Sequence, residues 1–380
     1  MNPTQRYDFL DWLRVIAIFV LIFFHTGMLF VGWGWHITND ETIPALVWPM
    51  DLAHRLRMPL LFVIAGAGMW FALQRRSGKA FAGERTMRLL VPAVIGMFLI
   101  VPPQIFIERI SHGEWHGGYL DFFTQRVLQF QPYPAGNFSW HHLWFIIYLY
   151  VYVLMLLPLM LWWTKAKPAL KPGTWIVLLA LPLGINEMFL KPIFPQTHNL
   201  VHDWYLFIHY LLLTVYGFAL ASSPSTWDWL AKVRRPVLAA AVAITIGLLS
   251  SFAMGLIEHD SRADAIWANV FTWLWLMVFL GYGRQYLSFT NRLIAWARDA
   301  SYPIYILHQT VILVIAYFVI REPWAPWTKF WLVALSTLVV CVVMYEFVLR
   351  RVAVLRLAFG IKQPKVRSGA ARVALPVQPA

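Results

Sequence analysis

The sequence predicts an all-α integral membrane protein with about ten transmembrane helices and both termini in the cytoplasm. Hydrophobic residues make up 60% of the 380 positions and charged residues only 13%, whereas about a quarter of the residues in a soluble domain are charged. Apolar runs of about 20 residues, the length that crosses a hydrocarbon core, recur along the chain. The 21 Trp, 15 Tyr and 27 Phe residues suit helices with aromatic belts at the membrane surfaces. This composition excludes a soluble enzyme, a disordered protein and, with Cys341 as the single cysteine, a disulfide scaffold.

Ten apolar runs are predicted to form the helices. Each is long enough, or nearly so, to span the bilayer on its own. The fifth run is the shortest and contains Pro182, a residue that interrupts helical hydrogen bonding. In chain order the predicted helices are 9–31, 50–73, 89–107, 142–163, 175–190, 204–221, 237–256, 266–283, 302–320 and 331–349.

The positive charges orient these helices. Of the 31 Lys and Arg residues, 22 fall in the segments on one side of the membrane and 6 in the loops on the other side. Lys and Arg concentrate in cytoplasmic segments, so the richer side is predicted to be cytoplasmic. The net charge of +13 is therefore a topology signal, and no nucleic-acid partner is expected. The six predicted cytoplasmic segments are 1–8, 74–88, 164–174, 222–236, 284–301 and 350–380.

Domain organisation is predicted to be simple. Residues 1–361 form one polytopic membrane domain, and residues 362–380 form a flexible basic cytoplasmic tail. The longest predicted outer loop, roughly 108–141, is long enough to cover a site.

The first helix carries two ionisable residues, Arg14 and His25, although such residues are costly inside a bilayer. Eleven residues correspond to three helical turns plus about 20°, so the two side chains lie on one face, about 16 Å apart along the axis. Arg14 is then near the inner surface and His25 in the outer third of the membrane. The alternative is structural: Arg14 reaches lipid headgroups or pairs with Asp11, and His25 makes one hydrogen bond within the bundle.

The second helix begins on the outer side with Asp51, His54 and Arg57, which are spaced three apart and share a face. Counting along both antiparallel helices brings Arg57 to the same depth as His25. A base beside a cationic donor could deprotonate a hydroxyl and stabilise an oxyanion. The alternative is an interfacial charge cluster held by Asp51.

Two arginines, Arg85 and Arg88, project together at the inner start of the third helix, and paired guanidinium groups suit phosphate recognition. Ordinary positive-inside anchoring would also place arginines there. Histidines at two other helix starts, His142 on the outer side and His308 on the inner side, are candidates for a functional or a structural role.

These residues resemble the acyltransferase 3 family of integral membrane O-acyltransferases. The family hallmark, a basic residue followed eleven positions later by histidine in the first helix, is matched by Arg14 and His25. The branch that modifies periplasmic glucans is the most similar. Further matches cover most of the first four helices and become sparse beyond them: Arg85-Thr86-Met87-Arg88-Leu89-Leu90-Val91-Pro92, Phe62-Val63-Ile64-Ala65-Gly66, Trp35-His36, Asp51-x-x-His54-x-x-Arg57-Met58, His142-Leu143-Trp144-Phe145 and Tyr305-x-x-His308. Many relatives have Ser where this chain has Ala65.

The resemblance implies transfer of an acetyl or succinyl group from cytosolic acyl-CoA to a hydroxyl of an extracytoplasmic acceptor, a glycan. It implies a multi-pass protein of the bacterial cytoplasmic (inner) membrane, with the lipid bilayer as partner, no tightly bound cofactor and no metal. His25 is the expected general base or transient acyl carrier, with Arg57 and His54 as catalytic partners. The expected acyl-CoA ligands are Arg14, Arg85, Arg88 and His308, and the expected acceptor ligands are His36, Asp51, His142 and Trp144.

Two other functional classes are compatible with ionisable residues inside a helical bundle. A transporter or proton-coupled carrier also places Arg, His and Asp there, but the sequence has no inverted repeat and no pair of broken helices. If the chain were only a scaffolding membrane subunit, the free-energy cost of placing arginines inside the membrane would have no explanation.

Overall fold

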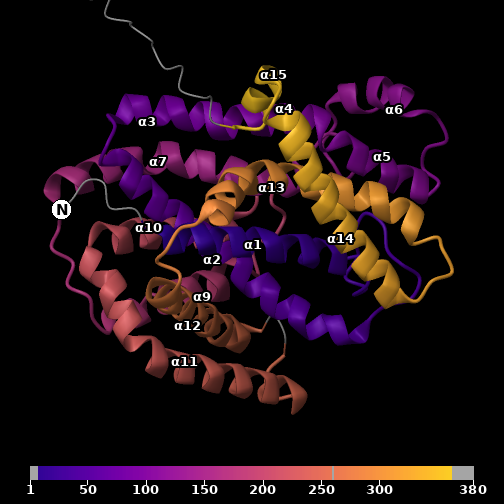
Figure 1. Cartoon of the computed structure of the whole chain (residues 1–380). Helices are drawn as coiled ribbons and strands as arrows, with labels where there is room; N and C mark the ends of the chain where they lie inside the picture. The colour runs from indigo at the N-terminus through magenta and orange to yellow at the C-terminus, as the bar shows by residue number, and fades with distance from the viewer. Residues whose placement is uncertain (1–6, 259–260, 362–380) are drawn as a thin grey trace, which may run out of the picture.

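The computed structural model describes residues 7–258 and 261–361, and within them the chain forms helices and no sheet. The predicted all-α class is confirmed, whereas the predicted tail, 362–380, lies outside the described residues. In chain order (Figure 1) the helices are α1 (Asp8–Gly27), η1 (Pro44–Leu46), α2 (Val47–Leu73), α3 (Gly78–Arg85), η2 (Thr86–Leu90), α4 (Val91–Leu99), α5 (Pro102–Ser111), α6 (Tyr119–Gln125), η3 (Val127–Gln129), η4 (His141–Leu143), α7 (Trp144–Ala166), α8 (Trp175–Leu178), α9 (Ala180–Leu190), α10 (Trp204–Ser222), α11 (Pro224–Ala253), α12 (Arg262–Tyr286), α13 (Arg292–Val319), α14 (Pro326–Met344), η5 (Tyr345–Leu349) and α15 (Ala353–Ala358).

Nine stretches of helix in the described chain are long and apolar enough to cross a membrane, and they match nine of the ten predicted runs. The remaining run, α8–α9, is shorter. Hydrogen bonds nevertheless connect the segments that flank it to the neighbouring helices. The carbonyl oxygen of Leu170 before it accepts a hydrogen bond from Ser223, where α10 ends. The carbonyl oxygen of His198 after it accepts one from Trp140, just before α7 begins.

Two segments predicted to be cytoplasmic, 222–236 and 284–301, are largely helical, so the helices extend well beyond the predicted apolar runs. Helix α11 begins at Pro224, a residue that suits the first turn of a helix. Helix α13 begins at Arg292, and the side chain of Asn291 caps it by accepting the N–H of Ile294 at 2.9 Å. A hydropathy pattern locates only the part of a helix that lies in hydrocarbon, whereas these helices continue beyond it.

The third crossing is interrupted. A π-helical segment, η2, contains Arg88 and separates α3 from α4, and a break at Ile100–Val101 separates α4 from α5. Pro102, Pro103 and Pro92 lack backbone N–H groups, which favours helix starts at these breaks. As a result, α5 is free to turn its polar residues Gln104 and Glu108 into the bundle, where both are buried.

The centre of the bundle depends on a close crossing of α2 and α10. A methyl group on Gly66 would overlap the carbonyl oxygen of Thr214, and one on Gly217 would overlap that of Val63. Small residues allow helix backbones to approach in this way within membranes. Figure 1 shows α1 and α2 in the middle of the bundle and α11 at its edge.

Candidate functional site

His25 and His308 meet where α1 packs against α13. Nδ1 of His25 lies 2.7 Å from Nε2 of His308, and the ring centroids are 4.9 Å apart. His308 is fully buried and His25 is partly buried. The opposite face of α1 exposes Phe19 and Val20. His25 therefore faces the interior of the bundle and not the lipid.

The hydrogen bonds of this pair fix its tautomers. Nδ1 of His308 lies 2.6 Å from the carbonyl oxygen of Tyr305, which can only accept, so Nδ1 carries the proton. An imidazolium ring inside the bundle, beside the cationic Arg57 side chain, would be costly, so both rings are neutral, and Nε2 of His308 accepts a hydrogen bond from Nδ1–H of His25. Nε2 of His25 is left with its lone pair, and no described residue hydrogen-bonds to it. That nitrogen is available as a base or a nucleophile.

Arg57 lies beside this pair, as predicted from the depths of His25 along α1 and Arg57 along α2. Its guanidinium carbon is 3.3 Å from the ring centroid of Phe24, the residue before His25, and it interacts electrostatically with His25. Two guanidinium nitrogens, Nε and Nη1, are buried and lack a hydrogen-bond partner among the described residues. Such unpaired buried donors are expensive. Arg57 is therefore a cationic donor that could receive an oxyanion.

A cavity of about 690 Å³ opens between α2, α9, α10 and α12, at the end where the predicted outer loops lie. Its lining combines aromatic rings with charges of both signs. Asp51 lines it and pairs with Arg55 at 3.1 Å, a contact that fits the alternative of a charge cluster held by Asp51. His54 joins the cavity to Phe24, because its ring centroid is 5.9 Å from that of Phe24. The polar and aromatic lining includes Trp33, Asp51, His54, Arg55, Glu187 and Tyr210.

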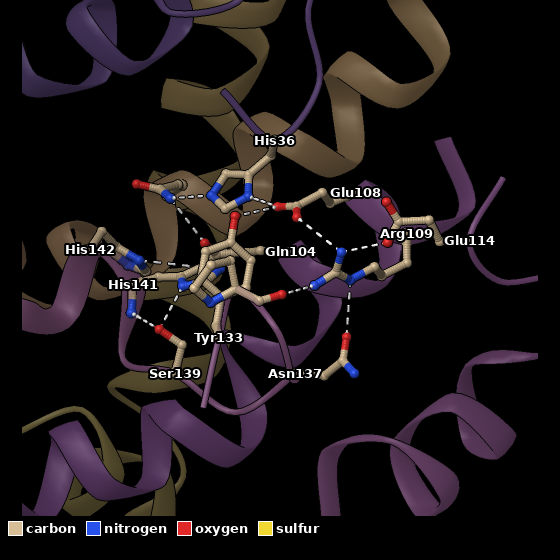
Figure 2. Close-up of polar contacts among 12 residues, drawn as sticks. His36, Gln104, Glu108, Arg109, Glu114, Tyr133, Asn137, Ser139, His141 and His142 are labelled. Atoms are coloured by element: carbon tan, nitrogen blue, oxygen red, sulfur yellow. Dashed lines mark hydrogen bonds and ion pairs between the residues drawn. The ribbon is translucent and has the colours of Figure 1, made fainter. Parts of the chain in front are cut away.

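A polar cluster around His36, Gln104 and Glu108 (Figure 2) reaches the histidine pair through His142, whose ring centroid is 5.3 Å from that of His308. His36 contacts the carboxylate of Glu108 through Nδ1 and the amide of Gln309 through Nε2, at 3.2 Å. Gln309 donates to Gln104 at 3.0 Å, which lies 3.4 Å from Nδ1 of His142. This cluster links four distant parts of the sequence: the loop after α1, α5, η4 and α13.

Tyr133 and Arg109 complete the cluster on its outer side (Figure 2). The Tyr133 hydroxyl donates to Glu108 at 3.4 Å. Burial and the Glu108 carboxylate raise the pKa of Tyr133 to about 12, so the phenol stays protonated. Arg109 forms an ion pair with Glu114 and donates to Asn137 at 3.1 Å.

The predicted acyl-CoA arginines lie at the opposite end of the bundle. Arg14 donates to Asp11 at 2.6 Å, and Arg298 lies 3.9 Å from the same carboxylate. This contact is the Asp11 pairing that the structural alternative describes. One turn further along α13, Tyr302 donates to the carbonyl oxygen of Arg88 at 2.7 Å.

Glu84 holds the second part of this basic region. It pairs with Arg76 at 3.1 Å, with Arg88 at 3.2 Å and with Arg85 at 3.4 Å. Three guanidinium groups around one carboxylate give this group of side chains a net positive charge. With Arg14 and Arg298, they form an inner basic region that spans α1, α3, η2 and α13.

The other predicted site residues make contacts elsewhere in the bundle. His142 packs against His308, with ring centroids 5.3 Å apart, and lies 2.9 Å from the carbonyl oxygen of Ile306 through Nε2. Trp144 contacts His198, with ring centroids 4.4 Å apart. His308, predicted as an acyl-CoA ligand, instead contacts His25 and His142, away from the inner basic region.

Several candidate functional residues were missed from the sequence. Glu108 falls at the start of the predicted outer loop 108–141, and Arg298 falls in the predicted cytoplasmic segment 284–301. Gln104 and Gln309 carry no charge and stand outside any recognised motif. The signal available for them was their polarity within otherwise apolar helices, which marks bundle-facing positions.

Comparison with known proteins gives one family and one group of relatives. Residues 7–346 match the family profile described as an acyltransferase domain, the acyltransferase 3 family. The chain is 23% identical over 381 residues to the glucans biosynthesis protein C of Escherichia coli K12 / DH10B, covering 92% of this chain and 93% of the relative. It is 24% identical to the protein of the same name from E. coli O157:H7 EC4115, with the same coverage. No solved structure gives a significant match.

Proposed function

This chain belongs to the acyltransferase 3 family and is a multi-pass membrane acyltransferase, and we propose that it moves an acyl group from cytosolic acyl-CoA to a hydroxyl of an extracytoplasmic glycan. The acyl group is acetyl or succinyl. The protein lies in the bacterial cytoplasmic membrane, with its basic end facing the cytosol. The single observation that carries the proposal is the hydrogen bond between His25 and His308, which leaves one histidine nitrogen unprotonated and unpaired.

His25 accepts the proton of the acceptor hydroxyl through Nε2. The hydroxyl oxygen attacks the thioester carbonyl carbon, and a tetrahedral intermediate forms. Its collapse breaks the carbon–sulfur bond, and the CoA thiolate takes the proton from the His25 imidazolium. In the acyl-carrier route Nε2 attacks the thioester carbonyl carbon first, and the carbon–sulfur bond breaks with loss of the CoA thiolate. The acceptor hydroxyl then attacks the acyl carbon, the bond from that carbon to Nε2 breaks, and the hydroxyl proton passes through Nε2 to the thiolate. His308 holds His25 in the required tautomer in either route.

Arg57 stabilises the negative oxygen of the tetrahedral intermediate. Its buried and unpaired N–H groups supply charge at the depth of His25, where little water competes. His54 lies between the cavity and Phe24, and it positions the acceptor near the reacting atoms.

The inner basic region receives the phosphates of the donor. Arg14, Arg85 and Arg88 are its ligands, and Arg298 joins them. Guanidinium groups match phosphate oxygens in geometry and charge. The pantetheine arm then follows α1 over the distance of about 16 Å that separates Arg14 from His25.

The outer cavity receives the glycan. Trp33 and Tyr210 offer aromatic faces, and Asp51 and Arg55 offer hydrogen-bonding groups to sugar hydroxyls. His36, His142 and Trp144 stay predictions as acceptor ligands, because none of them lines this cavity within the described chain. The names of the E. coli relatives support a glucan as the acceptor class.

Purified protein mixed with labelled acetyl-CoA or succinyl-CoA and envelope glycans tests this function. We expect label on the glycan hydroxyls with one of the two donors, identified by mass spectrometry of the product. His25→Ala should abolish the transfer, and His202→Ala, which changes an exposed histidine, should not. Solute flux through His25→Ala without CoA, and no acyl transfer by the wild type, would support the carrier alternative instead.

A further inference from the structure

A second group of potential ligands lies beside the histidine pair, and the bond-breaking and proton-transfer steps proposed above do not use it. His36 comes from the first loop after α1, Glu108 from α5 and His141 from η4 (Figure 2). One ligand atom from each of these residues lies within 4.8 Å of the other two. We propose that His36, Glu108 and His141 bind a divalent transition-metal ion, for which Zn²⁺ is the best match.

The chemistry of the three side chains favours zinc. Two imidazole nitrogens and one carboxylate oxygen form a common three-residue zinc set, which leaves a fourth position for water. Imidazole ligands disfavour Ca²⁺ and Mg²⁺, which take oxygen ligands. Ligand atoms on a zinc ion with bonds of about 2.1 Å are about 3.4 Å apart. Small rotations of these side chains therefore suffice to close the site.

An unpaired nitrogen points to a ligand here. Nε2 of His141 is shielded from solvent and has no hydrogen-bond partner in the described chain. Nδ1 of the same ring lies 2.8 Å from Oγ of Ser139, which can accept a hydrogen bond from it. In that tautomer Nε2 carries a buried lone pair, and a metal ion would satisfy it.

The surrounding residues fit an outer shell for such an ion. Metal-binding histidines usually donate their second N–H to a neighbouring oxygen. Ser139 is placed to accept from His141, and the side-chain amide of Gln309 lies 3.2 Å from Nε2 of His36. Binding through Nδ1 of His36 then moves the imidazole proton from Nδ1 to Nε2. Tyr133 hydrogen-bonds to Glu108 from the outer side.

Within the described residues, Arg109 is the cation that lies close to this group. Its Nη1 atom lies 4.0 Å from the Glu108 carboxylate, but the same atom pairs with Glu114. Glu108 presents its other oxygen, Oε2, to His36. The ion would therefore meet a carboxylate that Arg109 does not occupy.

A metal ion here would fasten the loop that carries His36 to α5 and to the start of α7. His142 follows His141 and packs against His308. The site would thus brace the shell around the histidine pair without taking part in the chemistry. The expectation that acyl transfer needs no metal is unaffected.

Zinc binding to the full-length protein tests the proposal directly. After removal of metals with a chelator, the wild type should take up one equivalent of Zn²⁺, measured by elemental analysis and titration calorimetry, and its thermal midpoint should rise with Zn²⁺ but not with Mg²⁺. Co²⁺ should give the visible absorption of a four-coordinate nitrogen and oxygen site.

Glu108→Gln is the decisive variant, because glutamine preserves the shape and a hydrogen bond to His36 but is a poor zinc ligand. We expect Glu108→Gln and His141→Ala each to weaken zinc binding at least tenfold, whereas His116→Ala, which changes an exposed histidine in the same outer region, should not. Equal zinc affinity in the wild type and in a folded Glu108→Gln protein would overturn the proposal. Acyl transfer need not be measured, so this result is independent of the proposed function.

Discussion

Nδ1 of His25 lies 2.7 Å from Nε2 of His308, and this hydrogen bond joins α1 to α13 at the level where Arg57 reaches the bundle interior. The two residues are 283 positions apart in the sequence. Nδ1 of His308 in turn donates to the carbonyl oxygen of Tyr305. His25 is therefore the donor within the pair, and its Nε2 atom has no hydrogen-bond partner among the described residues.

Replacing His308 should impair the chemical step and spare donor binding. His308→Leu removes the acceptor that fixes the tautomer of His25, so kcat should fall by roughly 10²-fold or more. His308→Gln keeps an oxygen that can accept from Nδ1 of His25 and should recover part of the rate. Steady-state rates and the Kd for acyl-CoA, measured on both variants, check this. A selective loss of acyl-CoA binding in His308→Leu would instead support the donor-binding role predicted from the sequence.

Replacing Arg57 should separate activity from stability. Arg57→Met removes the oxyanion donor, and kcat/KM should fall by about 10²- to 10³-fold. The same change removes a buried charge with unpaired N–H groups, so the thermal midpoint should stay equal or rise. The comparison needs transfer rates and thermal unfolding of one preparation. A large drop in the midpoint together with the lost activity would mean that Arg57 is a structural residue.

A methyl group at the crossing of α2 and α10 should destabilise the fold. Gly66→Ala and Gly217→Ala each push a Cβ atom into a backbone carbonyl of the other helix, and overpacking of this kind costs about 1–3 kcal/mol. Gly68→Ala is the matched control, because no atom lies near its added Cβ. Thermal unfolding in detergent should show lower midpoints for the first two variants only. Similar midpoints for Gly66→Ala and Gly68→Ala would contradict the observed helix crossing.

Charge changes around Glu84 should alter donor affinity in opposite directions. Arg85→Ala combined with Arg88→Ala should weaken acyl-CoA binding about tenfold or more, with acceptor binding unchanged. Glu84→Gln should strengthen acyl-CoA binding, because it removes the carboxylate that three arginines now share. Equilibrium binding at two salt concentrations measures both effects, with Lys167→Ala as a control for the general positive charge of this side. Unchanged affinity in the double variant would exclude these arginines as phosphate ligands.

His198 should make the stability of the protein depend on pH. Burial and the nearby Arg57 lower its pKa from 6.5 to about 4. Between these values the unfolded chain binds a proton that the folded chain does not, so stability is full above pH 6.5 and decreases as the pH falls towards 4. His198→Asn, which suits the positive φ of 57° at this position, should reduce that loss between pH 7 and pH 5. Equal pH dependence of the thermal midpoint in the two proteins would contradict this assignment.

The sequence predicted what local helix geometry determines. Apolar length located the crossings, and the helical period placed Arg14 and His25 on one face of α1. The depth match between His25 and Arg57 followed from rise per residue alone. These features need only the sequence of one or two antiparallel helices.

Contacts between distant helices were not accessible in the same way. The pairing of His25 with His308 and the meeting of His36, Glu108 and His141 depend on how α1, α5, α7 and α13 pack. Asp51 has two arginines within two turns, Arg55 and Arg57; it pairs with Arg55, whereas Arg57 packs against Phe24. Spacing along one helix cannot distinguish such alternatives.

Transfer across a sealed membrane tests the central claim most directly. The protein is reconstituted in vesicles, with labelled acyl-CoA on the side of the inner basic region and the glycan on the side of the cavity, and glycan-bound label is measured over time. We expect label on the glycan with wild type, none with His25→Ala, and none when acyl-CoA is supplied only on the glycan side. Transfer by His25→Ala at the wild-type rate, or equal transfer from either side, would contradict the account.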